Sequence, residues 1–169
     1  RQVKCETTEP GPVAKLNVDK TVAIPGDKGT AAVGDMLEYT VTISSLNDVA
    51  AVDVIVTDTM WESDSSVKIG GENGHLQYVT ADGEGGYYVT VDVPDNGSVD
   101  LYYTYTVPET DAGKTVKNTV TVGKMSYTIY TTVDEAEEPE PTPDKPRDPT
   151  EKELNQLYVD LECINADAQ

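Results

Sequence analysis

The sequence LEYTVTI at residues 37–43 carries a bulky residue at every odd position and a polar residue at every even position. Successive side chains of a β-strand point to opposite faces, so this alternation predicts a strand with one buried face and one face in solvent. The sequence LYYTYTV at residues 101–107 has nearly the same pattern, again with the bulky residues at odd positions. Both segments therefore predict strands that cover one core.

Similar short segments recur along the chain, separated by glycine, proline, asparagine and aspartate turn signals. The predicted strands are 14–24, 36–45, 50–58, 67–70, 76–80, 86–93, 98–107, 115–122 and 125–133. Tyrosine occurs ten times and phenylalanine is absent, and threonine and valine dominate the predicted strands. Many short strands without a helical period predict an all-β fold, an Ig-like antiparallel β-sandwich.

The domain organisation follows from shifts in composition. Residues 14–133 hold the predicted sandwich, and residues 1–13 are expected to be the end of a preceding module and a linker. Residues 134–149 form an acidic, proline-rich linker, which proline stiffens and like charges extend. Residues 150–169 are expected to be the truncated start of a following module, with a short helix and then an alternating strand at 158–164.

The charge of the chain limits its partners. Twelve Lys and Arg residues stand against 31 Asp and Glu residues, giving a formal net charge of −19 in 169 residues. Such a chain repels nucleic acid and anionic membranes, and no segment approaches the ~20 apolar residues of a membrane span. We expect an extracellular module without nucleic-acid binding or membrane insertion. Its acidic turns could collect Ca²⁺, but none matches the EF-hand pattern, so we expect no metal and no cofactor.

Two cysteines, Cys5 and Cys163, lie near opposite ends of the chain. If the termini meet, these residues could form a disulfide bond, and closing so long a loop would contribute roughly 4–5 kcal/mol on the chain-entropy model. Alternatively, each cysteine belongs to a truncated neighbouring module. Neither has the spacing of a zinc or redox motif.

Three polar residues occupy the apolar register of predicted strands. Lys20 shares the parity of Val18 and Val22, and Asn118 shares that of the valines around it. Asp58 follows Val52, Val54 and Val56 in the same way. An amine, a carboxyl group and a carboxamide directed into one core are costly unless they meet one another.

The same residues lie in four motifs that resemble a known family. VDKTV at 18–22, VGDMLEYTV at 33–41, VIVTDTM at 54–60 and KNTVTV at 117–122 resemble, in order, the signatures of Ig-like conserved-repeat domains of bacterial surface proteins. By motif, the chain is most similar to the isopeptide-forming domains of Gram-positive pilins and collagen-binding adhesins. The resemblance covers about residues 14–123.

The resemblance implies an intramolecular isopeptide bond between Lys20 and Asn118, with Asp58 promoting its formation. Glu38 is the alternative acid, but it lies on the polar parity of its strand. Burial lowers a lysine pKa and raises an aspartate pKa, so the amine becomes a nucleophile while the carboxyl group keeps a proton. Asp58 would then hydrogen-bond the carbonyl oxygen of Asn118 and pass a proton to the departing ammonia.

Two other outcomes for these residues stay open at this point. Lys20, Asp58 and Asn118 could form a buried non-covalent cluster, or a bulge could break the parity and leave Lys20 in water. In either case no cross-link forms. Where the bond does form, the reaction turns over once, so the protein is not an enzyme.

The resemblance and the composition together predict a structural stalk or spacer repeat of an adhesin or pilus-like protein on a bacterial cell surface or wall. Its partners would be neighbouring domains of the same surface protein. The alternative function is a ligand-binding adhesin module that recognises host glycan or protein through exposed aromatic residues, with Trp61 and Tyr88 as the candidates. An exposed patch including Trp61 would favour the alternative, and a buried Trp61 would count against it.

Overall fold

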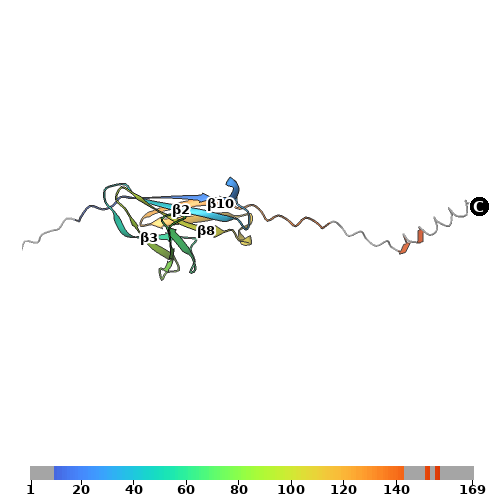
Figure 1. The fold of residues 1–169 in the computed structure, drawn as a ribbon. Coiled ribbons are helices and arrows are strands. Elements are labelled where there is room, and N and C mark those ends of the chain that lie inside the picture. Colours follow the sequence, from blue (N-terminus) through green and yellow to red (C-terminus); the bar gives the residue numbers. More distant parts are fainter. Residues whose placement is uncertain (1–9, 143–150, 153–154, 157–169) are drawn as a thin grey trace, which may run out of the picture. The chain divides into compact units, whose positions relative to one another are not determined.

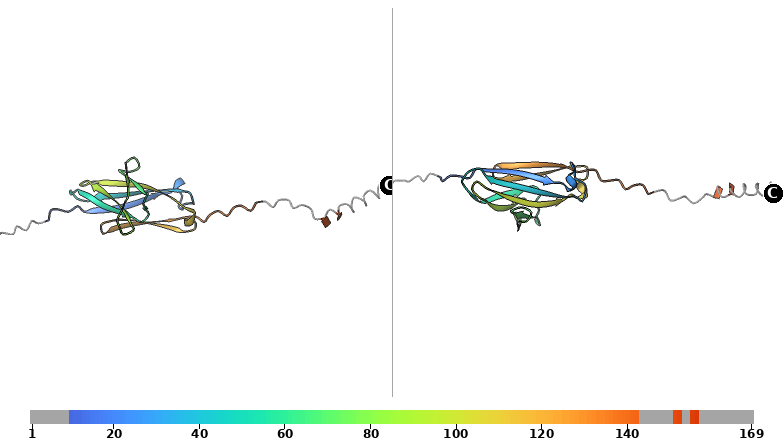
Figure 2. Two further views of the ribbon diagram at one scale, coloured as in Figure 1. Left: turned by 90° about the horizontal axis from the view of Figure 1, so that it is seen from below. Right: turned by 45° about the horizontal axis from the view of Figure 1, so that its top comes forward.

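The computed structural model describes residues 10–142, 151–152 and 155–156. Within residues 10–142 the chain is almost entirely β, and two antiparallel five-stranded sheets pack face to face (Figures 1 and 2). Each of the nine predicted strands corresponds to an observed strand. A short additional strand, β6 (Thr80–Ala81), was missed. The predicted all-β, Ig-like sandwich is confirmed.

The first sheet contains the N-terminal strand of the sandwich at one edge. Its strand order is β1 (Leu16–Ala23), β2 (Met36–Ser45), β8 (Ser98–Thr106), β4 (Ser66–Ile69) and β5 (His75–Tyr78). The second sheet has the order β10 (Met125–Thr132), β9 (Thr115–Val122), β3 (Ala51–Asp58), β7 (Tyr87–Val93) and β6. The candidate residues therefore come from both sheets. Lys20 lies on β1 of the first sheet, and Asp58 and Asn118 lie on β3 and β9 of the second.

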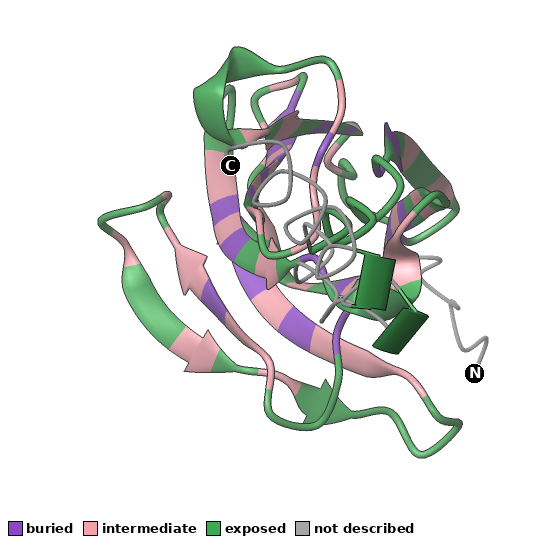
Figure 3. Cartoon of the chain, turned by 90° about the vertical axis from the view of Figure 1, so that its right-hand side faces the viewer, coloured by how far each residue is buried: buried purple, intermediate pink, exposed green. Residues whose placement is uncertain are grey.

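The alternation of buried and exposed residues explains why these strands pack as they do. Along the strands, buried positions alternate with half-buried or exposed ones (Figure 3). The odd residues of the 37–43 segment, from Leu37 to Ile43, have no exposed surface. Fully buried aliphatic side chains of this size each stabilise the fold by about 1.5–3 kcal/mol. The residues that the alternation at 37–43 predicts to be buried therefore lie in the core between the sheets.

One predicted register is wrong at the start of β3. The pairing of β3 with β7 shifts between Ala51 and Val54, and Asp53 adopts a left-handed backbone with φ 52°. This β-bulge turns Val52 outward, where 72% of it is exposed. After the bulge the alternation resumes, so Val56 and Asp58 are buried as predicted.

Two short 3₁₀ turns and one bridge complete the described part of the sandwich. The turns are η1 (Pro25–Asp27) and η2 (Glu109–Asp111). Ala31 forms a parallel bridge with Val133, and its amide donates to the Thr132 carbonyl at 2.9 Å. The segment between β1 and β2 is thus tied to the end of β10.

The chain divides into two compact units, Arg1–Ala136 and Glu137–Gln169. The strands occupy 16–132, inside the predicted 14–133 domain. Residues 151–152 and 155–156 are helical, as expected for the short helix after the linker. The strand predicted at 158–164 lies outside the described residues, and the assignment of 1–13 and 150–169 to neighbouring modules stays a prediction.

Candidate cross-link site

Lys20 lies in the middle of β1 and is directed into the sandwich. It pairs with Val41 of β2, and its inward-facing neighbour Val18 is buried with it. Only 2% of Lys20 is exposed. The alternative in which a bulge leaves this amine in water is therefore excluded.

Asp58 is the last residue of β3 and faces Lys20 from the opposite sheet. Its Oδ2 lies 2.7 Å from the Lys20 Nζ, and neither side chain has exposed surface. The other carboxyl oxygen, Oδ1, accepts a hydrogen bond of 2.9 Å from the backbone amide of Met60. The turn that ends β3 therefore fixes the orientation of the carboxyl group.

Asn118 lies on β9, the strand next to β3. Asp58 pairs with Val120, and Asn118 lies two residues before Val120 on β9, so its side chain points to the same inward face. Asn118 has no exposed surface. Its Nδ2 lies 3.1 Å from the Tyr103 hydroxyl oxygen and 3.6 Å from the Met60 sulfur, while its Oδ1 has no hydrogen-bond partner.

Tyr103, on β8, connects the other members of this site. Its hydroxyl donates a hydrogen bond to the Asp58 Oδ2 and accepts one from the Asn118 Nδ2. Lys20, Asp58, Tyr103 and Asn118 therefore form one continuous chain of polar contacts, which we call the cross-link cluster. The family resemblance implies a direct hydrogen bond from Asp58 to the Asn118 carbonyl oxygen, but in the structure the Tyr103 hydroxyl links the two side chains.

The Tyr103 ring is held by two further aromatic rings. It stacks on Tyr39 with centroids 5.4 Å apart and an interplanar angle of 19°, and Trp61 packs edge-on against it at 5.5 Å. The alternation at residues 101–107 predicts only that Tyr103 faces the core. Its position in a buried apolar row was the available signal, because a buried phenol needs a hydrogen-bond partner.

Burial sets the electrostatics of the cluster. Desolvation lowers the pKa of the Lys20 amine, although the charge of Asp58 acts in the opposite direction. Desolvation likewise raises the pKa of Asp58, opposed by Lys20 and by the hydrogen bond from Tyr103. Burial and the adjacent carboxyl group also raise the pKa of Tyr103. These shifts favour a neutral amine next to a neutral acid, the pair of protonation states that attack on an amide requires.

Glu38 lies outside the cluster. It is half-buried on the outer face of β2, where its Oε1 accepts a hydrogen bond from the Tyr102 hydroxyl. That bond, together with desolvation and the nearby carboxylate charge, raises the pKa of Tyr102 to about 12. Asp58 is therefore the acid that meets Lys20.

The predicted binding pair of Trp61 and Tyr88 is not formed. Trp61 is only 5% exposed, because its indole packs against Tyr103 in the core. Tyr88 is half-buried on β7, opposite Thr57 and Thr80. Trp61 and Tyr88 therefore do not share an exposed patch, which counts against the aromatic platform.

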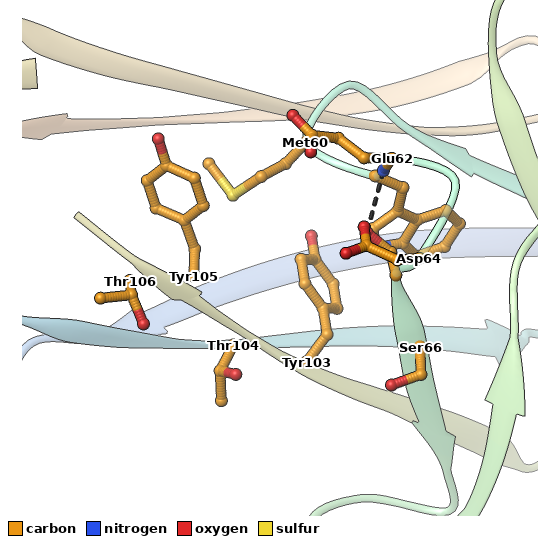
Figure 4. Close-up of a pocket in the computed structure, with 10 residues that line it drawn as sticks. Met60, Glu62, Asp64, Ser66, Tyr103, Thr104, Tyr105 and Thr106 are labelled. Carbon is orange, nitrogen blue, oxygen red and sulfur yellow. Dashed lines mark hydrogen bonds between the residues drawn. The ribbon is translucent and has the colours of Figure 1, made fainter. Parts of the chain in front are cut away.

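A surface pocket of about 310 Å³ adjoins the cluster (Figure 4). Met60, Trp61 and Tyr103 line it together with polar residues of β8 and of the segment after β3. In Figure 4 the side chains of Tyr103 and Tyr105 extend from β8 toward the segment that carries Met60. Met60 lines this pocket and also contacts the Asn118 amide nitrogen.

Within 10–142 and the helical positions after 150, no group of three or more His, Cys, Asp or Glu side chains is placed to hold a metal ion. No helix among these residues is long and apolar enough to cross a membrane. Cys5 and Cys163 lie outside the described residues, so their disulfide bond stays a prediction.

No protein-family model and no curated protein matches this chain. Similar solved structures include the CARDB domain of a Pyrococcus furiosus protein in complex with di-metal ions (14% identity, TM-score 0.44, 75% of this chain and 100% of that one). A sporulation control protein from Bacillus subtilis is 16% identical, with a TM-score of 0.42 over 73% of this chain and 51% of its own. A β-glucosidase from Listeria innocua is 15% identical, with a TM-score of 0.38 over 72% of this chain and 16% of its own. These values assign neither a family nor an activity.

Proposed function

We propose that this chain is a structural stalk or spacer module of a bacterial cell-surface protein, in an adhesin or pilus-like assembly. In this proposal Lys20 and Asn118 join through an isopeptide bond that Asp58 promotes. The observation that carries it is the convergence of an amine, a carboxyl group and a carboxamide from three strands in the interior of the sandwich. Its neighbours would be other modules of the same surface protein, outside the cell.

The chemistry of the proposal follows from the environment of the cluster. A neutral Lys20 amine attacks the Asn118 side-chain carbonyl carbon, and ammonia leaves. The fold supplies the proximity of the two groups, so entropy lost on folding also lowers the barrier of the reaction. The reaction consumes both side chains and occurs once.

The position of the bond explains why a stalk would use it. Lys20 lies in the first sheet and Asn118 in the second, so the bond would join the two sheets covalently. The chain enters the sandwich before β1 at one end and leaves after β10 at the other end (Figure 1). A force applied to these ends would pass through the bond rather than through the strand hydrogen bonds between residues 20 and 118.

The decisive experiment is intact-mass spectrometry of the reduced, denatured protein. We expect a mass lower than the sequence mass by one molecule of ammonia. Lys20→Arg keeps a positive charge but removes the primary amine, and it should have its full sequence mass. A parent protein with the full sequence mass would refute the cross-link and leave a non-covalent buried cluster.

A further inference from the structure

The Tyr103 hydroxyl stands between the acid and the leaving group of the proposed reaction. It contacts the Asp58 Oδ2, the same oxygen that lies 2.7 Å from the Lys20 Nζ. It also lies 3.1 Å from the Asn118 Nδ2, the nitrogen that must leave as ammonia. The Tyr103 hydroxyl thus contacts both the acid and the leaving nitrogen, so it offers a route by which a proton can pass from Asp58 to Asn118.

We propose that Tyr103 is a catalytic residue that relays a proton from Asp58 to the departing nitrogen of Asn118. This inference rests on the proposed cross-link. It adds a fourth participant to the reaction, with the phenol acting as the final proton donor. A relay of this kind needs a hydroxyl group that can accept one proton while giving up another, which tyrosine can do.

The proton movements balance without any other reactant. As the Nζ–Cγ bond forms, the amide nitrogen of Asn118 becomes tetrahedral and gains a lone pair that can accept a hydrogen bond. The Tyr103 hydroxyl, which donates to the Asp58 Oδ2 before the reaction, turns to donate to this nitrogen. It then gives its proton to the nitrogen and takes the proton of Asp58. Asp58 is then reprotonated by the Lys20 nitrogen. The Cγ–Nδ2 bond breaks, the carbonyl group re-forms, ammonia leaves, and Asp58 and Tyr103 return to their starting states.

The surroundings of Tyr103 suit this role. Its ring is fixed by Tyr39 on one side and by Trp61 at its edge, so the hydroxyl is held at one position. Met60 contacts the leaving nitrogen and lines the adjoining pocket together with Tyr103. Ammonia released at this point would leave beside Met60, which lines the pocket.

The first test is the Tyr103→Phe variant, which keeps the ring and removes the hydroxyl group. Chains are made in a short pulse of cell-free synthesis, quenched in acidic denaturant at intervals, and analysed by intact mass for loss of ammonia. We expect bond formation at least about tenfold slower than in the parent, within the range of general acid–base contributions. The matched control is Tyr102→Phe, which removes a hydroxyl bound to Glu38 from the outer face of the same strand and should react at the parent rate.

A second variant separates proton transfer from positioning. Replacing Tyr103 alone by 3-fluorotyrosine keeps the hydroxyl group and makes the phenol more acidic, so the relay should run faster than in the parent. A purely structural tyrosine would leave the rate unchanged. Parent chains that never lose ammonia would refute the cross-link itself. A parent that loses ammonia, with Tyr103→Phe reacting equally fast or the fluorinated protein unchanged, would overturn only the relay.

Discussion

At the scale of single residues, the central feature is a lysine and an aspartate removed from water together. Lys20 and Asp58 have no exposed side-chain surface, and each is shifted by desolvation toward its neutral form. A buried ion pair stabilises a fold poorly, because desolvation of both charges opposes their attraction. Conversion of the amine to an amide removes one of these charges permanently. In the proposed reaction, the desolvation of this pair is relieved once the amine has become an amide.

The pH dependence of stability tests the environment of Asp58. In Lys20→Met no cross-link forms and Asp58 loses its attractive partner, so its pKa in the folded state stays above the ordinary 3.8. The unfolded chain then loses this proton at lower pH than the folded chain, and stability falls as pH rises above 3.8. Urea unfolding of Lys20→Met at a series of pH values should show this fall, relative to the Lys20→Met/Asp58→Asn double variant. Parallel pH profiles for the two proteins would contradict the raised pKa.

At the scale of elements, β3 shows how a local backbone feature directs the Asp58 side chain into the core. The bulge at Asp53 adds one residue before the inward row of Val54, Val56 and Asp58. The Asp53 amide donates a hydrogen bond of 2.9 Å to the Asp92 carboxylate on β7, which holds the bulge against its neighbouring strand. The left-handed backbone there is tolerated by aspartate and unfavourable for β-branched residues.

Substitutions at Asp53 therefore have opposite expected effects. Asp53→Val should reduce the free energy of unfolding by about 1–2 kcal/mol, the cost of a left-handed conformation for such a residue. Asp53→Gly should be at least as stable as the parent, because glycine adopts positive φ without steric cost. Chemical denaturation of both variants measures the difference. Equal stability of the two would show that the bulge is not under this backbone constraint.

At the scale of the whole sandwich, the proposed bond closes a loop that contains most of the strands. Lys20 and Asn118 enclose all strands from β2 to β8 and parts of β1 and β9. Constraining an unfolded loop of roughly 100 residues stabilises the folded state by about 4–5 kcal/mol on the chain-entropy model. The bond would also keep the unfolded chain more compact. The free energy of unfolding would then fall less steeply with denaturant concentration.

Asn118→Ala should therefore lose about 4–5 kcal/mol of stability, on the chain-entropy model of cross-links. Its free energy of unfolding should also fall more steeply with denaturant concentration than that of the parent. Urea or guanidinium titration followed by Trp61 fluorescence measures both quantities. Asn17→Ala, an exposed position on β1, serves as the control and should change stability by less than about 0.5 kcal/mol. A parent and Asn118→Ala that unfold at the same denaturant concentration would rule out a stabilising cross-link.

Stretching single molecules tests the mechanical role directly. With handles at the two ends of the chain, Asn118→Ala should extend about 330–360 Å further than the parent when the sandwich unfolds, at about 3.3–3.6 Å for each of roughly 100 released residues. In the parent, the bond would keep that segment out of the force path. Equal extensions would show that the segment is not protected.

The sequence by itself determined the strands and the inward direction of Lys20, Asp58 and Asn118. Alternation is a local property, since consecutive side chains of a strand must point to opposite faces. The tertiary structure alone decided that Tyr103 joins Asp58 to Asn118, that Trp61 is buried against it, and that Val52 turns outward. These outcomes depend on how β8 faces β3 and β9 across the core and on the pairing of β3 with β7. Contacts between distant segments are set when the sheets pack, and the pattern within one strand carries no information about them.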